Sequence, residues 1–266
     1  MKHPQSILVE SNNGWTRVAL NRPGRRNAFD ACMVEELCET FKALGQDDSV
    51  RAIVLAGSGQ TFCAGADLRW IGADRIVSTS EARQDAEQLL GMFQTIDDCP
   101  CPVIGCVQGA VYGGGIGLVA ACDIAVASMD ATFTFSEIRL GLVPAVIAPF
   151  VLAKVGDSFV RRFCLTGEPF SASTAQDNGL IHDVVEPVAL DAYVASLAEQ
   201  ITRLAPQAVR DAKALFRRLH RLSQEERWKV CVEGNVRARL SSEAKEGIRA
   251  FRARRTPSWD SSTGGK

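Results

Sequence analysis

The sequence predicts a layered α/β domain followed by a helical C-terminal subdomain. Strand-like runs alternate with an amphipathic helix early in the chain, whereas only helical patterns follow Pro144, and this order is typical of layered α/β proteins. The 266 residues are 46% apolar and 23% charged, which is enough for a full hydrophobic core. We expect a core domain over residues 1–200, a helical subdomain over residues 201–257 and a disordered tail over residues 258–266.

Charge and cysteine content narrow the class of protein. The chain carries 30 basic and 31 acidic side chains, so it lacks the strongly basic surface that coating a nucleic acid requires. Nine cysteines at irregular spacings indicate reduced thiols, and Cys99 and Cys101 have no second pair with which to bind zinc. Residues 1–10 lack the apolar run of a signal peptide. We therefore expect a cytoplasmic protein without a metal site or a nucleic-acid partner.

The chain begins with a predicted β-hairpin. Residues 7–10 and 15–20 are rich in β-forming side chains, and residues 12–14 (NNG) between them are typical of a tight turn. Asp30 then precedes apolar residues at three- and four-residue steps, which indicates an amphipathic helix. A buried strand over residues 52–55 is expected to follow this helix.

The middle of the chain is predicted to form one long helix and several buried strands. Ser78 and Glu81 have the spacing of a capping box at the start of the helix, and Pro100 ends it. We expect no strand beyond Glu137. The strands expected before that point cover residues 103–107, 124–127 and 132–135, and a turn with a short helix covers residues 113–121.

Residues 102–122 hold no charged side chain and are long enough to cross a membrane. Six glycines, Gln108 and the lack of flanking aromatic and basic anchors favour a buried strand, a glycine turn and a short buried helix instead. We therefore expect no membrane partner.

Six helices are predicted after Pro144. Apolar residues there repeat at helical spacing, and Ser223 with Glu226 has the spacing of a second capping box. The predicted helices cover residues 149–165, 172–178, 190–204, 206–222, 223–240 and 242–254.

Two glycine-rich segments would bring backbone amides close to a ligand: residues 62–68 (FCAGADL), and residues 109–117, which hold three consecutive glycines. An ordinary loop and close helix packing are the alternative explanations. The second segment also imitates a dinucleotide-binding fingerprint through Gly115, Gly117 and Ala120. Only about eight residues separate Gly115 from the next strand, however, which is too short for the crossover that such a fold requires.

A third candidate is Glu137, which lies after an aromatic strand and before an apolar segment. Burial there would raise its carboxyl pKa into the range of an acid/base catalyst, whereas solvation or pairing with Arg139 is the alternative. A basic cluster of Arg22, Arg25 and Arg26 would either bind phosphate groups or form a solvated loop.

Taken in order, these motifs resemble the crotonase family, which is the enoyl-CoA hydratase/isomerase family, over roughly residues 5–255. The resemblance implies a layered core built as a spiral of ββα units and acyl-CoA chemistry. It also implies homotrimers or dimers of trimers, with oligomerisation through the C-terminal helices. The motifs that carry it are residues 21–23 (NRP), 27–28 (NA), 62–68 (FCAGADL), 109–115 (GAVYGGG), 122–124 (CDI) and 137–144 (EIRLGLVP).

The resemblance also assigns site residues. It implies that the backbone amides of Ala66 and Gly114 form an oxyanion hole for the thioester carbonyl, where each donor is typically worth about 3 kcal/mol. It implies that Glu137 acts as the catalytic acid and base. No separate cofactor and no metal are expected, because coenzyme A is part of the substrate. The residues that it places at the substrate and its coenzyme A are Arg25, Arg26, Ala64, Ala66, Asp67, Leu68, Gly114 and Gly117.

One position departs from the family pattern. The second glutamate that places water in typical hydratases of the family falls at Gly117, which has no side chain to do so. The resemblance favours an enoyl-CoA hydratase, a lyase of fatty acid metabolism or leucine degradation, with 3-methylglutaconyl-CoA as a candidate substrate. One alternative is a Δ3,Δ2-enoyl-CoA isomerase that uses Glu137 as a proton shuttle. The other is a non-catalytic CoA- or RNA-binding homologue.

Overall fold

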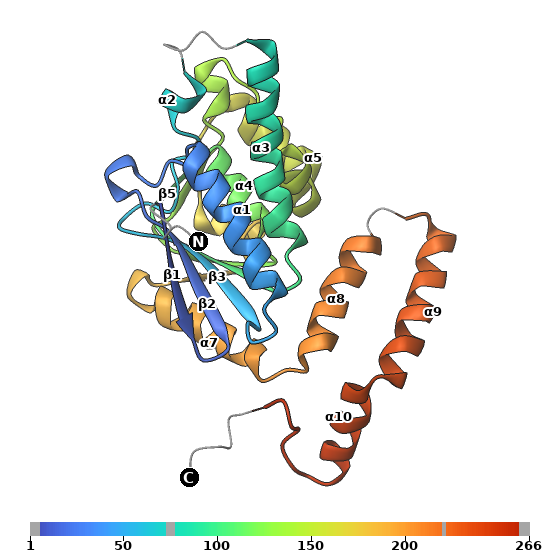
Figure 1. The fold of residues 1–266 in the computed structure, drawn as a ribbon. Coiled ribbons are helices and arrows are strands. Elements are labelled where there is room, and N and C mark those ends of the chain that lie inside the picture. Colours follow the sequence, from blue (N-terminus) through green and yellow to red (C-terminus); the bar gives the residue numbers. More distant parts are fainter. Residues whose placement is uncertain (1–5, 73–77, 220–221, 261–266) are drawn as a thin grey trace.

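The computed structural model describes residues 6–72, 78–219 and 222–260, which form an α/β core with three C-terminal helices set apart from it (Figure 1). In this part of the chain the main sheet has the strand order β1-β2-β3-β4-β6-β9. The β1–β2 pair is antiparallel and the other neighbours are parallel, so the predicted layered α/β fold is confirmed. The strands are β1 (Ile7–Asn12), β2 (Trp15–Leu20), β3 (Ala52–Gly57), β4 (Val103–Val107), β6 (Ile124–Ser128) and β9 (Asp183–Val185).

A second, smaller sheet brings together two segments that the sequence analysis treated separately. It consists of β5 (Ala110–Tyr112), β7 (Thr132–Thr134) and β8 (Phe170–Ser171). β5 and β7 are parallel, with Tyr112 opposite Thr134. Since both strands run in the same direction, the glycine segment that follows β5 lies beside the segment that leads to Glu137.

Helices cover both faces of the main sheet. On one face, residues of α1, α3, α4 and α5 pack with the sheet into one large apolar cluster, which includes Leu37, Phe93 and Ile116. On the other face, α7 packs through Leu190 and Val194. α4 is buried along almost its whole length, so its position is firmly set by packing. These helices are α1 (Ala31–Gln46), α3 (Thr79–Asp98), α4 (Gly114–Ala121), α5 (Ala148–Thr166) and α7 (Leu190–Thr202); α2 (Leu68–Ile71) and α6 (Ala172–Asp177) are shorter.

Local signals in the sequence are confirmed at several element ends. Gly14 has a φ of +81°, as the hairpin turn requires, and the Asp30 carboxylate accepts a hydrogen bond from Met33 N at the start of α1. Ser78 and Glu81 form the predicted capping box of α3. These interactions involve neighbours in the sequence, which is why sequence patterns predict them.

Three strands were missed. β5 lies inside the glycine-rich segment, and β8 and β9 follow Glu137, so the prediction of no strand beyond Glu137 is wrong. All three strands have only two or three residues, too few to display an alternating pattern. They are strands because the parent sheets offer them hydrogen-bonding partners.

The C-terminal helices project away from the core (Figure 1). They are α8 (Pro206–Leu219), α9 (Gln224–Leu240) and α10 (Ser242–Arg252), and residues 220–221 of the predicted helix 206–222 lie outside the described residues. α8 is tied to the core by Lys213, whose Nζ lies 2.6 Å from Asp123 Oδ2, and by Arg210, whose Nη2 donates to the Val50 carbonyl at 3.2 Å. The predicted domain boundary at residue 200 stays a prediction.

Residues 258–260 of the predicted disordered tail contact α10, and the disorder of the tail stays a prediction. Ser258 N donates a hydrogen bond to Glu246 Oε1 at 3.0 Å, and the Trp259 indole packs against α10 at Gly247. Residues 258–260 are therefore held in place, because their partners lie on the helix just before them. Residues 261–266 of that predicted tail lie outside the described residues.

The glycine-rich apolar stretch forms β4, β5 and α4. Within the described ranges, no helix combines the length and the apolar character that crossing a membrane would need. All nine cysteines are free thiols.

Candidate active site

A cavity of about 390 Å³ opens where the segments that follow β3, β5 and β7 meet. One wall is formed by the loop of residues 62–68, which we call the active-site loop. A second wall comes from the start of α4 and a third from residues 136–147. The residues that line the cavity are Phe29, Ala64, Gly65, Ala66, Leu68, Ile71, Leu89, Phe93, Tyr112, Gly113, Gly114, Ser136, Glu137, Arg139, Leu140, Leu142, Val143, Pro144, Val146 and Ile147.

Backbone hydrogen bonds set the active-site loop beside the start of α4. Tyr112 N donates to the Cys63 carbonyl at 3.0 Å. On either side of Ala66, Phe29 N donates to Gly65 O at 2.9 Å and Asp67 N donates to Phe29 O at 2.8 Å. Because Gly65 and Asp67 are both bonded to Phe29, the residue between them, Ala66, is held at the cavity wall.

The amides of Ala66 and Gly114 are free to bind a ligand. Both residues line the cavity, and neither backbone N–H donates to an acceptor in the described part of the chain. A Cβ built on Gly65 would lie 3.3 Å from Gly114 N, so the two segments approach closely. Two free amides at one cavity wall, one of them at the N-terminus of a buried helix, can bind a negatively charged oxygen.

Glycine is required where α4 begins. A Cβ at Gly114 would lie 2.4 Å from Phe29 Cζ, and a Cβ at Gly113 would lie 2.8 Å from Glu137 Oε1. Gly113 also has a φ of +46°, a conformation that side-chain-bearing residues rarely adopt. The consecutive glycines therefore allow an aromatic ring and a carboxylate to approach the helix end from opposite sides.

Glu137 supplies the only carboxylate among the described residues that line the cavity. It begins the 3-10 helix Glu137–Leu140 and is half-buried, and its Oε2 is buried without a hydrogen-bond partner. Burial raises the pKa of this carboxyl above its usual range. The alternative of pairing with Arg139 is not observed, because Arg139 Nη2 donates to the Gly167 carbonyl at 2.6 Å. Glu137 is thus poised to take up and release a proton.

Asp67 is not among the residues that line the cavity, and its contact with the substrate stays a prediction. Its Oδ2 lies 3.1 Å from Arg22 Nη2, and its Oδ1 accepts a hydrogen bond from Arg69 N at 3.1 Å. Both carboxylate oxygens are therefore used within the protein. Arg22, which the sequence analysis grouped with candidate phosphate ligands, also lies 3.0 Å from Asp30 Oδ2 and serves the same network.

Gly117 is not among the residues that line the cavity, and its contact with the substrate stays a prediction. It lies on the buried side of α4, where a Cβ would come within 2.3 Å of Ile147 Cγ2 and 2.9 Å of Phe93 Cε1. The position at which a water-placing glutamate was expected is occupied by these two apolar side chains.

The remaining predicted residues fall into two groups. Ala64 and Leu68 line the cavity beside Ala66. Arg25 and Arg26 are exposed and do not line the cavity, although the Arg26 carbonyl accepts a hydrogen bond from Ala64 N at 2.9 Å. Contact of these two arginines with the phosphates of coenzyme A stays a prediction.

Sequence reasoning missed much of the apolar lining. Leu89 and Phe93 of α3 belong to the apolar stripe that predicts the helix, but a stripe does not tell which of its residues face a cavity. Phe29 and Ile147 lie at the starts of helices, where no motif marks them. The clash that a side chain at position 114 would cause is the one signal for Phe29, and it needs coordinates.

Comparison with known proteins agrees with this geometry. The family model for enoyl-CoA hydratase/isomerase matches residues 10–262, and the chain therefore belongs to this family, also called the crotonase family. The structure is similar to that of an enoyl-CoA hydratase from Shewanella pealeana, with a TM-score of 0.92 and 32% identity over 97% of both chains.

Two curated relatives illustrate the range of chemistry in the family. An enoyl-CoA hydratase of Alternaria alternata is 31% identical over 93% of this chain and 82% of its own length. A peroxisomal Δ(3,5)-Δ(2,4)-dienoyl-CoA isomerase of Arabidopsis thaliana is 31% identical over 94% of each. The expected family and fold are confirmed, and the protein is an enzyme of the hydratase/isomerase class.

Proposed function

We propose that this protein is an enoyl-CoA hydratase, a lyase that adds water across the 2,3 double bond of an acyl-CoA thioester. The observation that carries the proposal is the unpartnered Glu137 carboxyl in the same cavity as the free amides of Ala66 and Gly114. An acid/base group and an oxyanion site are the two functions that this reaction needs.

In the proposed mechanism, the ionised Glu137 accepts a proton from a water molecule while the hydroxyl group bonds to carbon 3. The electron pair of the double bond moves toward the thioester and leaves an enolate oxygen, which the amides of Ala66 and Gly114 stabilise. Each donor of this kind typically contributes about 3 kcal/mol. Glu137 then returns its proton to carbon 2, so the acid/base group is regenerated.

The acyl group would lie in the cavity against the apolar side chains of Phe93, Leu142 and Ile147. We include 3-methylglutaconyl-CoA among the candidate substrates because Arg139 also lines the cavity and would pair with a second carboxylate. In this proposal the reaction belongs to leucine degradation or fatty acid metabolism, and coenzyme A enters only as part of the substrate.

A second candidate function is that of a Δ3,Δ2-enoyl-CoA isomerase. It is favoured by Gly117, where Ile147 and Phe93 fill the space that a water-placing side chain would need. Isomerisation requires one proton carrier and no water, so Glu137 alone would take a proton from carbon 2 and deliver it to carbon 4. The same amides would stabilise the intermediate.

One experiment separates these functions. The protein is offered crotonyl-CoA, a 3-enoyl-CoA and 3-methylglutaconyl-CoA in separate reactions, and the products are weighed by mass spectrometry. Hydration adds the mass of one water, whereas isomerisation leaves the mass unchanged and moves the double bond. If none of the three substrates changes, the hydratase proposal is wrong, and binding of CoA or RNA by the intact protein then tests the non-catalytic alternative.

We also propose that the protein is a cytoplasmic homotrimer or a dimer of trimers. The free cysteines favour a reducing compartment. The C-terminal helices expose large apolar side chains, among them Phe216 (64%), Trp228 (64%) and Phe251 (85%), and such surfaces favour subunit contacts. Analytical ultracentrifugation tests this proposal, and a monomer at micromolar concentration would refute it.

A further inference from the structure

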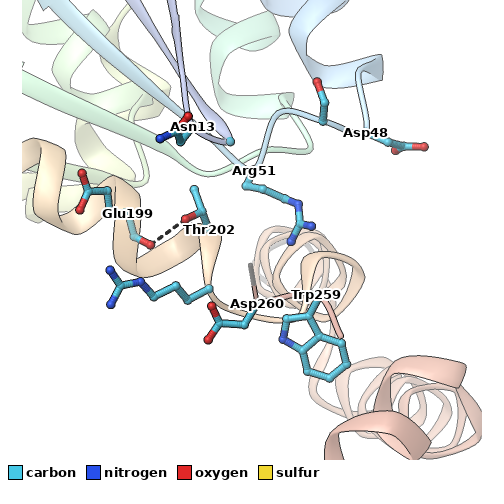
Figure 2. Close-up of a pocket in the computed structure, with 10 residues that line it drawn as sticks. Asn13, Asp48, Arg51, Glu199, Thr202, Trp259 and Asp260 are labelled. Carbon is cyan, nitrogen blue, oxygen red and sulfur yellow. Dashed lines mark hydrogen bonds between the residues drawn. The ribbon is translucent and has the colours of Figure 1, made fainter. Parts of the chain in front are cut away.

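A second cavity lies at the N-terminal end of β3, whereas the active site lies beyond the C-terminal end of this strand. It has a volume of about 580 Å³ and is bounded by the β1–β2 turn, the loop before β3, the end of α7 and the C-terminal segment (Figure 2). Arg51 directly precedes β3, whereas the active-site loop follows it. The six residues of β3 therefore separate the two sites by roughly 20 Å at about 3.3 Å per residue.

Arg51 has an unused hydrogen-bond donor at this cavity. Its backbone N–H donates to the Gly14 carbonyl at 2.7 Å, which fixes the residue beside the hairpin turn. Its Nη1 is buried and has no hydrogen-bond partner. Arg203, the residue that follows α7, lines the same cavity. A shielded guanidinium nitrogen without a partner is best satisfied by a carboxylate or phosphate oxygen.

Trp259 contributes an aromatic ring to the lining of this cavity. Figure 2 shows Trp259 and Asp260 across the cavity from Arg51. The edge of the Trp259 indole packs against α10, since a Cβ on Gly247 would lie 3.0 Å from its Cη2. Asn13 adds a polar side chain at the rim. A planar ring can therefore lie against the indole while a polar substituent reaches the rim.

Asp48 and Glu199 at the cavity do not pair with Arg51. Asp48 lies 3.5 Å from Arg210 Nη1, which belongs to α8. The Glu199 carboxylate is turned away from Arg51 (Figure 2). The donor on Arg51 thus remains available within a cavity whose volume suits a small organic ligand.

We propose that this cavity binds a nucleotide, with its phosphate on Arg51 and its base stacked on Trp259. Carboxylates and hydroxyls at the rim would accept or donate hydrogen bonds to the ribose and the base. A free nucleotide and the nucleotide end of coenzyme A share this chemistry. The site is independent of the hydratase reaction, because none of its residues lines the active-site cavity.

The test is isothermal titration calorimetry of the whole chain with AMP, with adenosine 3′,5′-bisphosphate, with adenosine and with inorganic phosphate. We expect both nucleotides to bind, and the tighter of the two identifies the source of the ligand. Arg51→Gln and Trp259→Leu should each weaken binding about tenfold or more, because each removes one of the two main contacts. Arg161→Gln, which removes an exposed cation on α5, is the matched control and should bind as the parent does.

Several results would overturn the proposal. Equal nucleotide affinity in the parent and in Arg51→Gln would remove the phosphate contact, and equal affinity for adenosine and AMP would do the same. Inorganic phosphate that binds as tightly as AMP would exclude stacking on Trp259. Loss of binding in Arg25→Gln with full binding in Arg51→Gln would place the nucleotide at the active site only. Thermal unfolding checks that each variant is folded. If Arg51→Gln does not fold, the affinity of Trp259→Leu for AMP tests the proposal.

Discussion

Arg22 holds the active-site loop through an ion pair with Asp67, whose Oδ2 lies 3.1 Å from Arg22 Nη2. The same nitrogen lies 3.0 Å from Asp30 Oδ2, so one guanidinium ties the loop to the start of α1. The side chains of Arg22 and Asp67 are only 21% and 12% exposed, which limits solvent screening of the pair. Asp67 directly follows Ala66, so this ion pair orients the N–H group that is proposed to bind the thioester oxygen.

We predict that Arg22→Gln reduces kcat far more than it reduces stability. A shift of about 1 Å in a catalytic group can cost about 100-fold in rate, and Asp67, the neighbour of Ala66, would lose its ion pair with Arg22. Steady-state kinetics and thermal unfolding of the same variant measure the two effects. Arg22→Lys, which keeps the charge, should recover part of the rate. Unchanged kcat in a folded Arg22→Gln protein would show that the ion pair does not position the loop.

Glu137→Gln should lose about 100- to 10,000-fold in turnover, the usual contribution of general acid/base catalysis. Binding of an acyl-CoA ester should persist, because the proposed oxyanion contacts come from the backbone of Ala66 and Gly114. Turnover is measured by product mass and binding by calorimetry. Parent-like turnover in this variant would exclude Glu137 from the mechanism.

The pH dependence should reflect the burial of Glu137. Its carboxyl must be ionised to accept a proton, and burial raises its pKa, so kcat/KM should fall on the acid side at a higher pH than an exposed glutamate would give. The native state holds this proton more tightly than the unfolded state does. The free energy of unfolding should therefore decrease as pH rises from the ordinary to the raised pKa. Glu137→Gln should remove that decrease, and an acid limb at the ordinary glutamate value would contradict the prediction.

Gly114→Ala should damage both activity and packing, because the added Cβ would lie 2.4 Å from Phe29 Cζ. Overpacking of this kind typically costs about 1–3 kcal/mol. Gly91→Ala is a matched control within α3, since no atom lies within 4 Å of its added Cβ, and it should stabilise the helix by about 0.5–1 kcal/mol. Similar activity for the two variants would count against the oxyanion role of Gly114.

Gly117→Glu should not create the missing catalytic carboxylate. The side chain would clash with Ile147 and Phe93, which lie between position 117 and the cavity, and a buried unpaired carboxylate is strongly unfavourable. We expect a large fall in the melting temperature and no gain in hydration of crotonyl-CoA. A folded variant with faster hydration would show that α4 can turn this position into the cavity.

Sequence motifs indicated which segments form the site, because each motif is a run of residues that are adjacent in the chain. The family resemblance assigned Ala66 and Gly114 to the site, and both line the cavity. Gly117 and Asp67 lie in the same motifs and were assigned to the substrate, yet one faces Ile147 and the other Arg22. A motif records which residues occur together, but not the direction in which each one faces.

The cavity at Arg51 was not predicted at all. Its walls come from residues near positions 13, 51, 203 and 259, which no local pattern relates. The tail near Trp259 was expected to be disordered because it ends the chain, and its contacts with α10 depend on a turn of the chain after that helix.

By itself, the sequence determined the order of the longer helices and strands, the helix caps, the hairpin and the family, because these rest on interactions or patterns among near neighbours in the chain. Tertiary structure alone decided which amides stay unpaired, that Glu137 is half-buried while Arg139 binds Gly167, and that Gly117 is covered by Ile147. The physical reason is that burial and hydrogen-bond satisfaction depend on segments that meet only after the sheets and helices have packed.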